Sequence, residues 1–301
     1  MNEDNSTKAS FNWYPGHMAK TKKQIIEDLK LIDIVVELLD ARIPNSSRNP
    51  VMNEIIKDKK KIVVLNKSDL SDTTENQKWL NYYKLNKVVA VCTDSNSGKG
   101  IQNMIKEIES MMQEEIDEYA QKGRVGRKIR VMVLGIPNVG KSSFINKIAK
   151  RNTAEVANRP GVTRKKQWIR LNDKIELLDT PGVLWPKFES EEVALNLAYT
   201  GTIKDDIIDI TEVAFQLLKY LLDNCKEKVI ERYKLDECEI DKILNNPQDE
   251  NLNKYEIMQM IGKKRGALVS GGMVDDEKTA KIIIEDFRKC RIGKITLEKV
   301  K

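Results

Sequence analysis

The run Gly135-Ile136-Pro137-Asn138-Val139-Gly140-Lys141-Ser142 matches the pattern GxxxxGK[ST] and constrains the fold of this 301-residue chain more than any other feature. An apolar run at 129–134 precedes it, and a helix-like run at 143–149 follows it. In such a strand–loop–helix setting, glycines let backbone N–H groups surround phosphates at the start of a helix. The alternative is a glycine-rich turn that matches the pattern by chance, but such a turn would need neither a strand before it nor a helix after it. The loop therefore predicts a phosphate site on an α/β sheet.

Two residues of this loop have side chains suited to binding phosphates and their metal ion. We predict that the Lys141 ammonium binds the β- and γ-phosphates of a nucleotide and assists their hydrolysis, and that the Ser142 hydroxyl binds Mg²⁺. The remaining predicted phosphate-loop residues are Pro137, Asn138, Val139, Gly140 and Ser143.

A second phosphate motif, Asp179-Thr180-Pro181-Gly182, lies further along the chain. A carboxylate at the end of a strand can hold Mg²⁺ through water, and the Gly182 amide can meet a γ-phosphate. Asp, Pro and Gly also favour ordinary turns. The motif therefore gains its meaning from lying downstream of the phosphate loop, and it predicts Asp179 and Gly182 as site residues.

The run Asn66-Lys67-Ser68-Asp69 follows an apolar run and resembles the NKxD guanine motif of GTPases. The Asp69 carboxylate can accept hydrogen bonds from guanine N1–H and from its exocyclic amine. Adenine has an acceptor at N1 and would leave a buried carboxylate unpaired, which is costly. The Lys67 stem can cover the base plane. A polar loop after a strand is the plainer interpretation of the motif taken alone.

A further base contact is predicted at Cys92-Thr93-Asp94, which precedes Ser97-Gly98-Lys99-Gly100. It weakly resembles the last GTPase motif, usually Ser-Ala-Lys, so only backbone contacts to the base are expected from it. An ordinary Gly/Ser turn remains the alternative.

The motifs occur in an unusual order: the guanine motif at 66–69 precedes the phosphate loop at 135–142. In ordinary GTPases the phosphate loop comes first. A sheet opened at one loop and rejoined at another keeps its site while its termini move. The pattern resembles the circularly permuted GTPases.

The remaining pattern predicts the fold class and two domains. Short β-branched runs at 32–40, 61–66, 88–92, 129–135 and 175–179 alternate with helix-like segments, which indicates a parallel-rich α/β sheet. After about residue 185, apolar residues recur at helical spacing in the runs 189–197, 209–225, 238–244, 253–261 and 277–287. We expect a circularly permuted P-loop GTPase domain at 1–186, with an N-terminal extension at 1–20, and a smaller all-helical domain at 187–301.

Several longer segments resemble the ribosome biogenesis GTPase A family, and the resemblance covers nearly the whole chain. They are WYPGHMAK at 13–20, LLDARIPNSSRNP at 38–50, GIPNVGKSSFIN at 135–146, RPGVTR at 159–164, DTPGVLWP at 179–186, KKRGALVSGGMVD at 263–275 and DFRKCRIGKITLE at 286–298. The resemblance implies a GTPase that acts late in assembly of the large ribosomal subunit, slow alone and stimulated by that subunit. It implies GTP and GDP as ligands, with the subunit precursor and its rRNA as partners, and it implies that the helical domain at 187–301 binds RNA or the ribosome.

The resemblance also implies residue roles. Thr163 matches the switch threonine that binds Mg²⁺ in the GTP state, and Asn138 matches the asparagine of potassium-activated GTPases. His17 matches a histidine proposed to act in hydrolysis, and an imidazole has a useful pKa for handling water. The alternatives are a variable loop position for Asn138, and a turn cap or an rRNA contact for His17. Val183 stands where Ras-like proteins carry a water-positioning glutamine, so another group must take that role.

Composition sets limits on the partners. The net charge of +6 permits a polyanionic partner without requiring one. Basic clusters at 20–23, 122–130, 164–166 and 263–265 fit RNA, although any one of them could be a solvated face. The four cysteines form no CxxC pair, and no run approaches 18 apolar residues. We expect a cytoplasmic monomer with no membrane contact.

Two competing functions stay open. One is a zinc-bearing permuted GTPase acting on the small subunit, which the missing CxxC disfavours. The other is a nucleotide-dependent binding module without useful hydrolysis, which Val183 keeps open.

Overall fold

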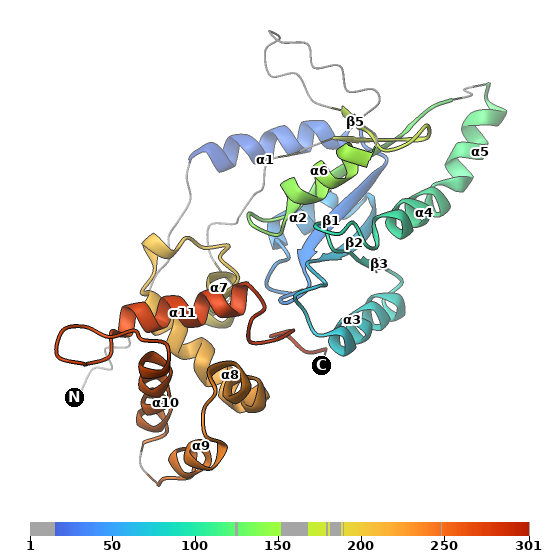
Figure 1. The fold of residues 1–301 in the computed structure, drawn as a ribbon. Helices are drawn as coiled ribbons and strands as arrows, with labels where there is room; N and C mark the ends of the chain where they lie inside the picture. Colours follow the sequence, from blue (N-terminus) through green and yellow to red (C-terminus); the bar gives the residue numbers. More distant parts are fainter. Residues whose placement is uncertain are drawn as a thin grey trace, which may run out of the picture.

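The computed structural model describes residues 16–123, 126–151, 168–178, 180, 188, 190–247 and 249–300. Within these residues one six-stranded sheet has the order β3-β2-β1-β4-β6-β5 (Figure 1). The strands are β1 (Ile34–Asp40), β2 (Lys60–Asn66), β3 (Val89–Cys92), β4 (Ile129–Leu134), β5 (Trp168–Arg170) and β6 (Ile175–Leu178). All pairs are parallel except β5 with β6. The predicted parallel-rich sheet is confirmed, and β5 is a strand that the sequence pattern did not reveal.

The strand order explains how a permuted chain builds one site. β1 pairs with β2 on one side and with β4 on the other. The strands β2 and β3 therefore lie on one side of β1, and the later strands β4, β6 and β5 lie on its other side. Ligand sites of parallel sheets form at the carboxyl ends of the strands, at such a reversal point. The loops after β1, β2 and β4 therefore meet at one edge.

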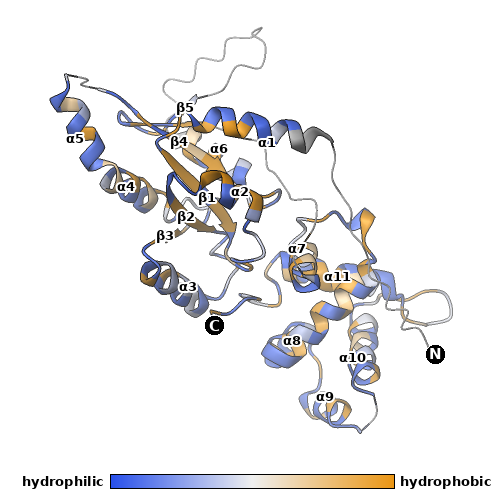
Figure 2. Ribbon diagram, turned by 180° about the vertical axis from the view of Figure 1, so that it is seen from behind, coloured by the Kyte–Doolittle hydropathy of each residue, from blue (hydrophilic) through white to orange (hydrophobic). Residues whose placement is uncertain are grey.

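Helices cover both faces of the sheet, as apolar side chains on alternate strand residues require. On one face lie α4 (Ile101–Met111) and α6 (Lys141–Arg151), packed on one set of alternating strand residues. On the other lie α1 (Gly16–Leu29), α2 (Pro50–Ile56) and α3 (Thr73–Leu85). Figure 2 shows the apolar strands in orange between helices of mixed colour. The helical segment between β3 and β4 is divided at Met112 into α4 and α5 (Gln113–Gln121).

Beyond residue 190 the described chain is helical, which confirms the all-helical prediction. The helices are α7 (Glu191–Tyr199), α8 (Ile210–Tyr233), α9 (Glu237–Leu244), α10 (Glu250–Lys264) and α11 (Asp276–Arg288), with a short 3-10 turn, η1 (Asp205–Ile207). Each of the five α-helices begins after a side chain that accepts its first free N–H groups: Ser190, Asp209, Asp236, Asp249 and Asp275. α8 continues past the predicted end at 225, with non-helical backbone angles at Cys225. The boundary at 186/187 itself stays a prediction.

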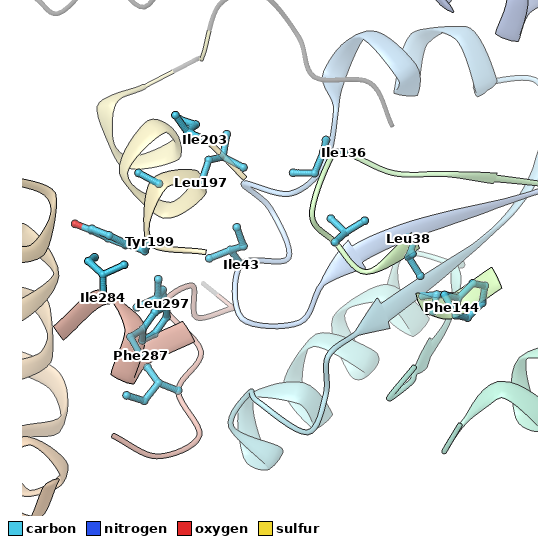
Figure 3. Packing of buried hydrophobic residues seen from close by; sticks show 14 of the residues in the cluster. Leu38, Ile43, Ile136, Phe144, Leu197, Tyr199, Ile203, Ile284, Phe287 and Leu297 are labelled. Atoms are coloured by element: carbon cyan, nitrogen blue, oxygen red, sulfur yellow. The ribbon is translucent and has the colours of Figure 1, made fainter. Parts of the chain in front are cut away.

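One apolar core joins the sheet to the helical region. Figure 3 shows Ile43, from the loop after β1, beside Leu197 of α7 and Leu297 near the chain end. After α11 the chain returns towards α3 (Figure 1), and Ile295 and Leu297 are buried. The two regions therefore share one apolar core. No helix in the described ranges is long and apolar enough to cross a membrane.

Candidate nucleotide site

The phosphate loop joins β4 to α6, as predicted. Ile136 and Val139 are buried and anchor the loop in the core. Gly140 has φ +89°, and a Cβ there would lie 2.5 Å from Asn66 Nδ2. The loop thus needs glycine at 140 because the guanine-motif asparagine approaches its backbone closely.

The predicted phosphate and Mg²⁺ ligands lie at the start of α6. Lys141 Nζ donates to the carbonyl of Thr180, which belongs to the segment after β6. Ser142 and Ser143 are exposed in the first turn of α6. A helix start with a lysine and a hydroxyl is a donor set that fits a nucleotide phosphate with its Mg²⁺.

Asn66 holds the predicted base and phosphate loops together. Its Nδ2 donates to Val139 O at 2.8 Å, and its Oδ1 accepts from Thr93 Oγ1 at 3.1 Å and Ser95 Oγ at 2.6 Å. Both ends of this fully buried amide are thus bonded to the protein. The structure brings the segments 66–69, 92–94 and 135–142 together, and the base contact of Asn66 stays a prediction.

The segment 92–94 is bonded tightly to the guanine motif. Thr93 N donates to Leu65 O at 2.9 Å, and Ser68 N donates to Thr93 O at 3.1 Å. Gly100 has φ +81°, and a Cβ there would lie 2.0 Å from Cys92 O. Sequence reasoning missed Ser95, although it directly follows the predicted segment.

Lys67 reaches from the guanine motif to the phosphate loop. Its Nζ donates to Asn138 O at 2.5 Å and lies 3.0 Å from Asp40 Oδ2. Asp40, at the end of β1, also accepts from Arg42 Nε at 3.0 Å and Nη2 at 2.8 Å. Asp40 therefore holds Lys67 at the loop. In the sequence, the signal for this pair was two charged residues, Asp40 and Arg42, shortly after the apolar residues Leu38 and Leu39.

The Asp40–Arg42 pair is almost wholly buried, with side-chain exposures of 3% and 2%. Burial alone would raise the pKa of the Asp40 carboxyl. The charges of Arg42 and Lys67, with the hydrogen bonds from Arg42, outweigh burial and hold that pKa well below its usual range. Arg42 Cζ also lies 5.5 Å from the Phe287 ring centroid of α11. The pair thus connects the base loop to the helical region.

Replacing Asp40 by Asn is expected to lower the free energy of unfolding by about 3–5 kcal/mol, because it leaves a buried guanidinium without its counter-charge. Urea unfolding followed by circular dichroism measures the change. The matched control is Glu118→Gln, which removes one partner of an exposed pair with Lys122. That control should change stability by less than about 1 kcal/mol. Equal effects of the two variants would contradict the role assigned to the buried pair.

Asp69, the predicted guanine reader, is half-buried. Burial raises the pKa of its carboxyl and nearby Asp94 adds to this, while its own backbone amide, Lys294 and Arg42 act in the opposite direction. Lys294 belongs to the returning chain end, so a distant segment contributes to the charge around the base reader.

Asn138 contacts the helical region directly. Its Nδ2 donates to Thr200 O and Gly201 O, each at 3.1 Å, at the carboxyl end of α7. Arg288 of α11 donates to Ala198 O at 2.7 Å and Tyr199 O at 3.0 Å, and forms a bidentate pair with Asp205. Cationic and amide donors suit the free carbonyls of a helix end. A phosphate-loop side chain therefore takes part in capping the first helix of the helical region.

Several predicted residues lie outside this geometry. Thr163, Asp179 and Gly182 are outside the described residues, as is Val183. His17 lies in the first turn of α1, but its side chain is not among those described. Their roles stay predictions.

A GxxxxGKS loop at the carboxyl end of a parallel strand, bonded through Asn66 and Lys67 to an NKxD loop, defines the class of P-loop GTPases. The family model described as 50S ribosome-binding GTPase matches residues 130–258, beginning within β4. Ribosome biogenesis GTPase A of Priestia megaterium is 45% identical over 290 residues, covering 96% of both chains. Mitochondrial ribosome-associated GTPase 1 of Xenopus tropicalis is 32% identical, covering 95% of this chain and 94% of that protein. The chain therefore belongs to the ribosome biogenesis GTPase A family.

A solved structure supports the fold. GNP-bound YlqF from T. maritima matches with a TM-score of 0.62 and 23% identity, covering 93% of this chain and 98% of that one. The permuted sheet followed by a helical region is thus a fold already seen in a solved structure.

Proposed function

We propose that this chain binds and hydrolyses GTP as an assembly factor of the large ribosomal subunit, binding the subunit precursor in its GTP state and leaving it after hydrolysis. The family match and the 50S ribosome-binding description support the subunit assignment. The motifs joined at the carboxyl edge of the sheet support GTP as the ligand.

The observation that carries the cycle is the contact between Asn138 and the end of α7. A nucleotide that reshapes the phosphate loop moves the group that holds the first helix of the helical region. The segment 179–182, the predicted γ-phosphate sensor, also leads within a few residues into α7. Through these two routes the GTP and GDP forms would make different contacts with the helical region. A ligand can shift a conformational equilibrium only through such a difference.

Each group has an assigned role. Asp69 reads the guanine edge, Lys67 covers the base, and Lys141 neutralises the β- and γ-phosphates. Ser142, Thr163 and, through water, Asp179 would hold Mg²⁺, the ion that P-loop GTPases typically use.

GTP turnover with and without purified large-subunit precursor tests the function. The precursor should raise kcat, because Val183 cannot position water in the isolated chain. Turnover that stays negligible in both conditions, with tight GTP binding, would favour the alternative of a binding module without hydrolysis.

Hydrolysis is expected to be faster in K⁺ than in Na⁺ by at least about tenfold, because a cation near the β- and γ-phosphates can replace an arginine finger. Asn138 Nδ2 is bonded to α7, which leaves its Oδ1 as the atom to face the cation. Phosphate release at equal ionic strength measures the effect. Equal rates in the two salts would remove Asn138 as a potassium ligand.

His17→Ala is expected to lower precursor-stimulated turnover on the order of 10²-fold, the usual contribution of a positioned proton-transfer group. GTP affinity should stay unchanged, since His17 is assigned to water and not to nucleotide. Stimulated turnover equal to that of the unaltered chain would leave His17 with a structural or RNA-contact role.

The α10–α11 connection is the best-supported rRNA contact among the described residues. Lys263 and Lys264 are exposed, and so are Leu268, Val269 and Met273 in the loop that follows. Figure 1 shows this loop projecting away from the sheet. Arg265 is not part of that surface: its Nη2 donates to Arg232 O, and its guanidinium packs on the Tyr233 ring. We assign the surface to phosphate contacts by the two lysines, with the exposed apolar residues beside them.

A further inference from the structure

The last residues of the chain lie against the guanine-reading loop. Ile295 N donates to Leu70 O at 3.3 Å, and Asp72 N donates to Thr296 Oγ1 at 3.1 Å. Leu70 directly follows the Asn66-Lys67-Ser68-Asp69 motif, and Asp72 lies two residues further on. The backbone on the carboxyl side of Asp69 is thus held by residues more than 220 positions away.

Further bonds fix this segment to the rest of the GTPase domain. Leu297 N donates to Arg42 O at 2.8 Å, and Trp79 Nε1 of α3 donates to Glu298 O at 3.0 Å. The Glu298 carboxylate accepts from Asn45 N at 2.6 Å and from Ser46 N at 2.9 Å. Three of these four bonds end on the loop after β1, which carries Arg42, and the fourth ends on α3.

The same segment is held from the helical region. Tyr220 of α8 donates to Leu297 O at 2.9 Å, Lys228 of α8 donates to Lys294 O at 2.7 Å, and Asn196 Nδ2 of α7 donates to Glu298 Oε1 at 3.3 Å. Ile295, Thr296 and Leu297 are only 4–7% exposed. Residues 294–298, which we name the C-terminal strap, are therefore bonded on one side to loops of the guanine site and on the other to α7 and α8.

We propose that the C-terminal strap is a positioning element for guanine recognition: it holds the loop 66–72 so that the Asp69 carboxylate meets the base edge. The inference rests on the proposed function, since it assigns Asp69 to guanine. Because α7 and α8 hold the strap, a partner that displaces the helical region loosens the base site as well. The strap thereby gives the subunit precursor a route to nucleotide affinity that is separate from the contact of Asn138 with α7.

The test compares GDP with inosine diphosphate, which keeps N1–H but lacks the exocyclic amine. Asp69 should prefer GDP by roughly 10–100-fold, the effect of one hydrogen bond to a charged group. Thr296→Val keeps the buried volume but removes the acceptor of Asp72 N. It should reduce the GDP/inosine diphosphate preference to less than about threefold and raise the GDP dissociation rate about tenfold. Glu298→Gln, which weakens the bonds to Asn45 N and Ser46 N, should also lower the GDP/inosine diphosphate preference and raise the GDP dissociation rate.

The matched control is Lys299→Gln, whose Nζ bonds to Asn224 Oδ1 of α8 and not to the base loop. Simple loss of folded protein lowers affinity for both nucleotides equally and leaves their ratio unchanged, so the ratio separates positioning from stability. If Thr296→Val lowers the melting temperature so far that the protein is not folded in the assay, a chain truncated after Leu297 serves as a second variant. An unchanged ratio in folded variants would overturn the strap proposal, whereas an unaltered chain that does not prefer GDP over ADP would overturn the proposed function itself.

Discussion

Replacing Asp69 by Asn is expected to reverse the base preference of this GTPase from guanine to xanthine nucleotides. Guanine offers two donors, N1–H and the 2-amine, and a carboxylate accepts both. An Asn side chain has one acceptor and one amine, so its amine would face the guanine amine and both would lose their partner. Xanthine carries a carbonyl at that position, which the Asn amine can meet. We expect GDP affinity to fall on the order of 10²-fold or more, because unpaired polar groups in a closed site are heavily penalised.

Competition against fluorescent GDP by GDP, xanthosine diphosphate and ADP measures this change. The matched control is Asp58→Asn, an exposed carboxylate before β2 at the opposite edge of the sheet. That control should keep the guanine preference. An Asp69→Asn protein that still selects GDP would show that another group reads the base.

Replacing Lys141 by Ala is expected to lower the hydrolysis rate on the order of 10²–10³-fold, with a smaller loss of GDP affinity. The ammonium neutralises charge that grows on the phosphates as the bond breaks, and removing one such preorganised group costs this much in comparable sites. In the structure Lys141 Nζ donates to Thr180 O, so it already lies between the phosphate loop and the segment after β6. A bound phosphate would compete with that carbonyl for the ammonium.

Single-turnover phosphate release, with precursor present, measures the Lys141→Ala effect. Lys106→Ala, an exposed lysine of α4, is the control and should leave the rate unchanged. If Lys141→Ala retained more than about a tenth of the rate, phosphate neutralisation would have to come from another group.

Local features of this protein could be read from its sequence. The strand, loop and helix around 129–149 were predicted because glycine spacing, an apolar run and a hydroxyl after the lysine all lie within some twenty residues. The helical region was predicted for a similar reason, since each helix carries its own periodicity. β5 was missed because an edge strand of only 3 residues shows too little pattern to be recognised.

Residues whose roles depend on packing between distant segments could not be read in this way. Asp40 and Arg42 were seen only within a family-like segment, because their partners, Lys67 and Phe287, lie elsewhere in the chain. The C-terminal strap lies within the family-like run at 286–298, but it has no periodicity, and its role follows only from where it returns to the domain. Asn138 was matched to a potassium ligand because its position in the phosphate loop can be read from the sequence. Its contact with α7 arises from the tertiary fold and could not be read in this way.

The affinity of this chain for purified large-subunit precursor, measured in separate titrations with a non-hydrolysable GTP analogue and with GDP, tests the central claim most directly. The contact between the phosphate loop and α7, and the short connection from 179–182 into that helix, predict tighter binding with the GTP analogue, by at least about tenfold, which corresponds to about 1.4 kcal/mol. Equal affinity of the two nucleotide forms would contradict the claim that the nucleotide controls the helical region.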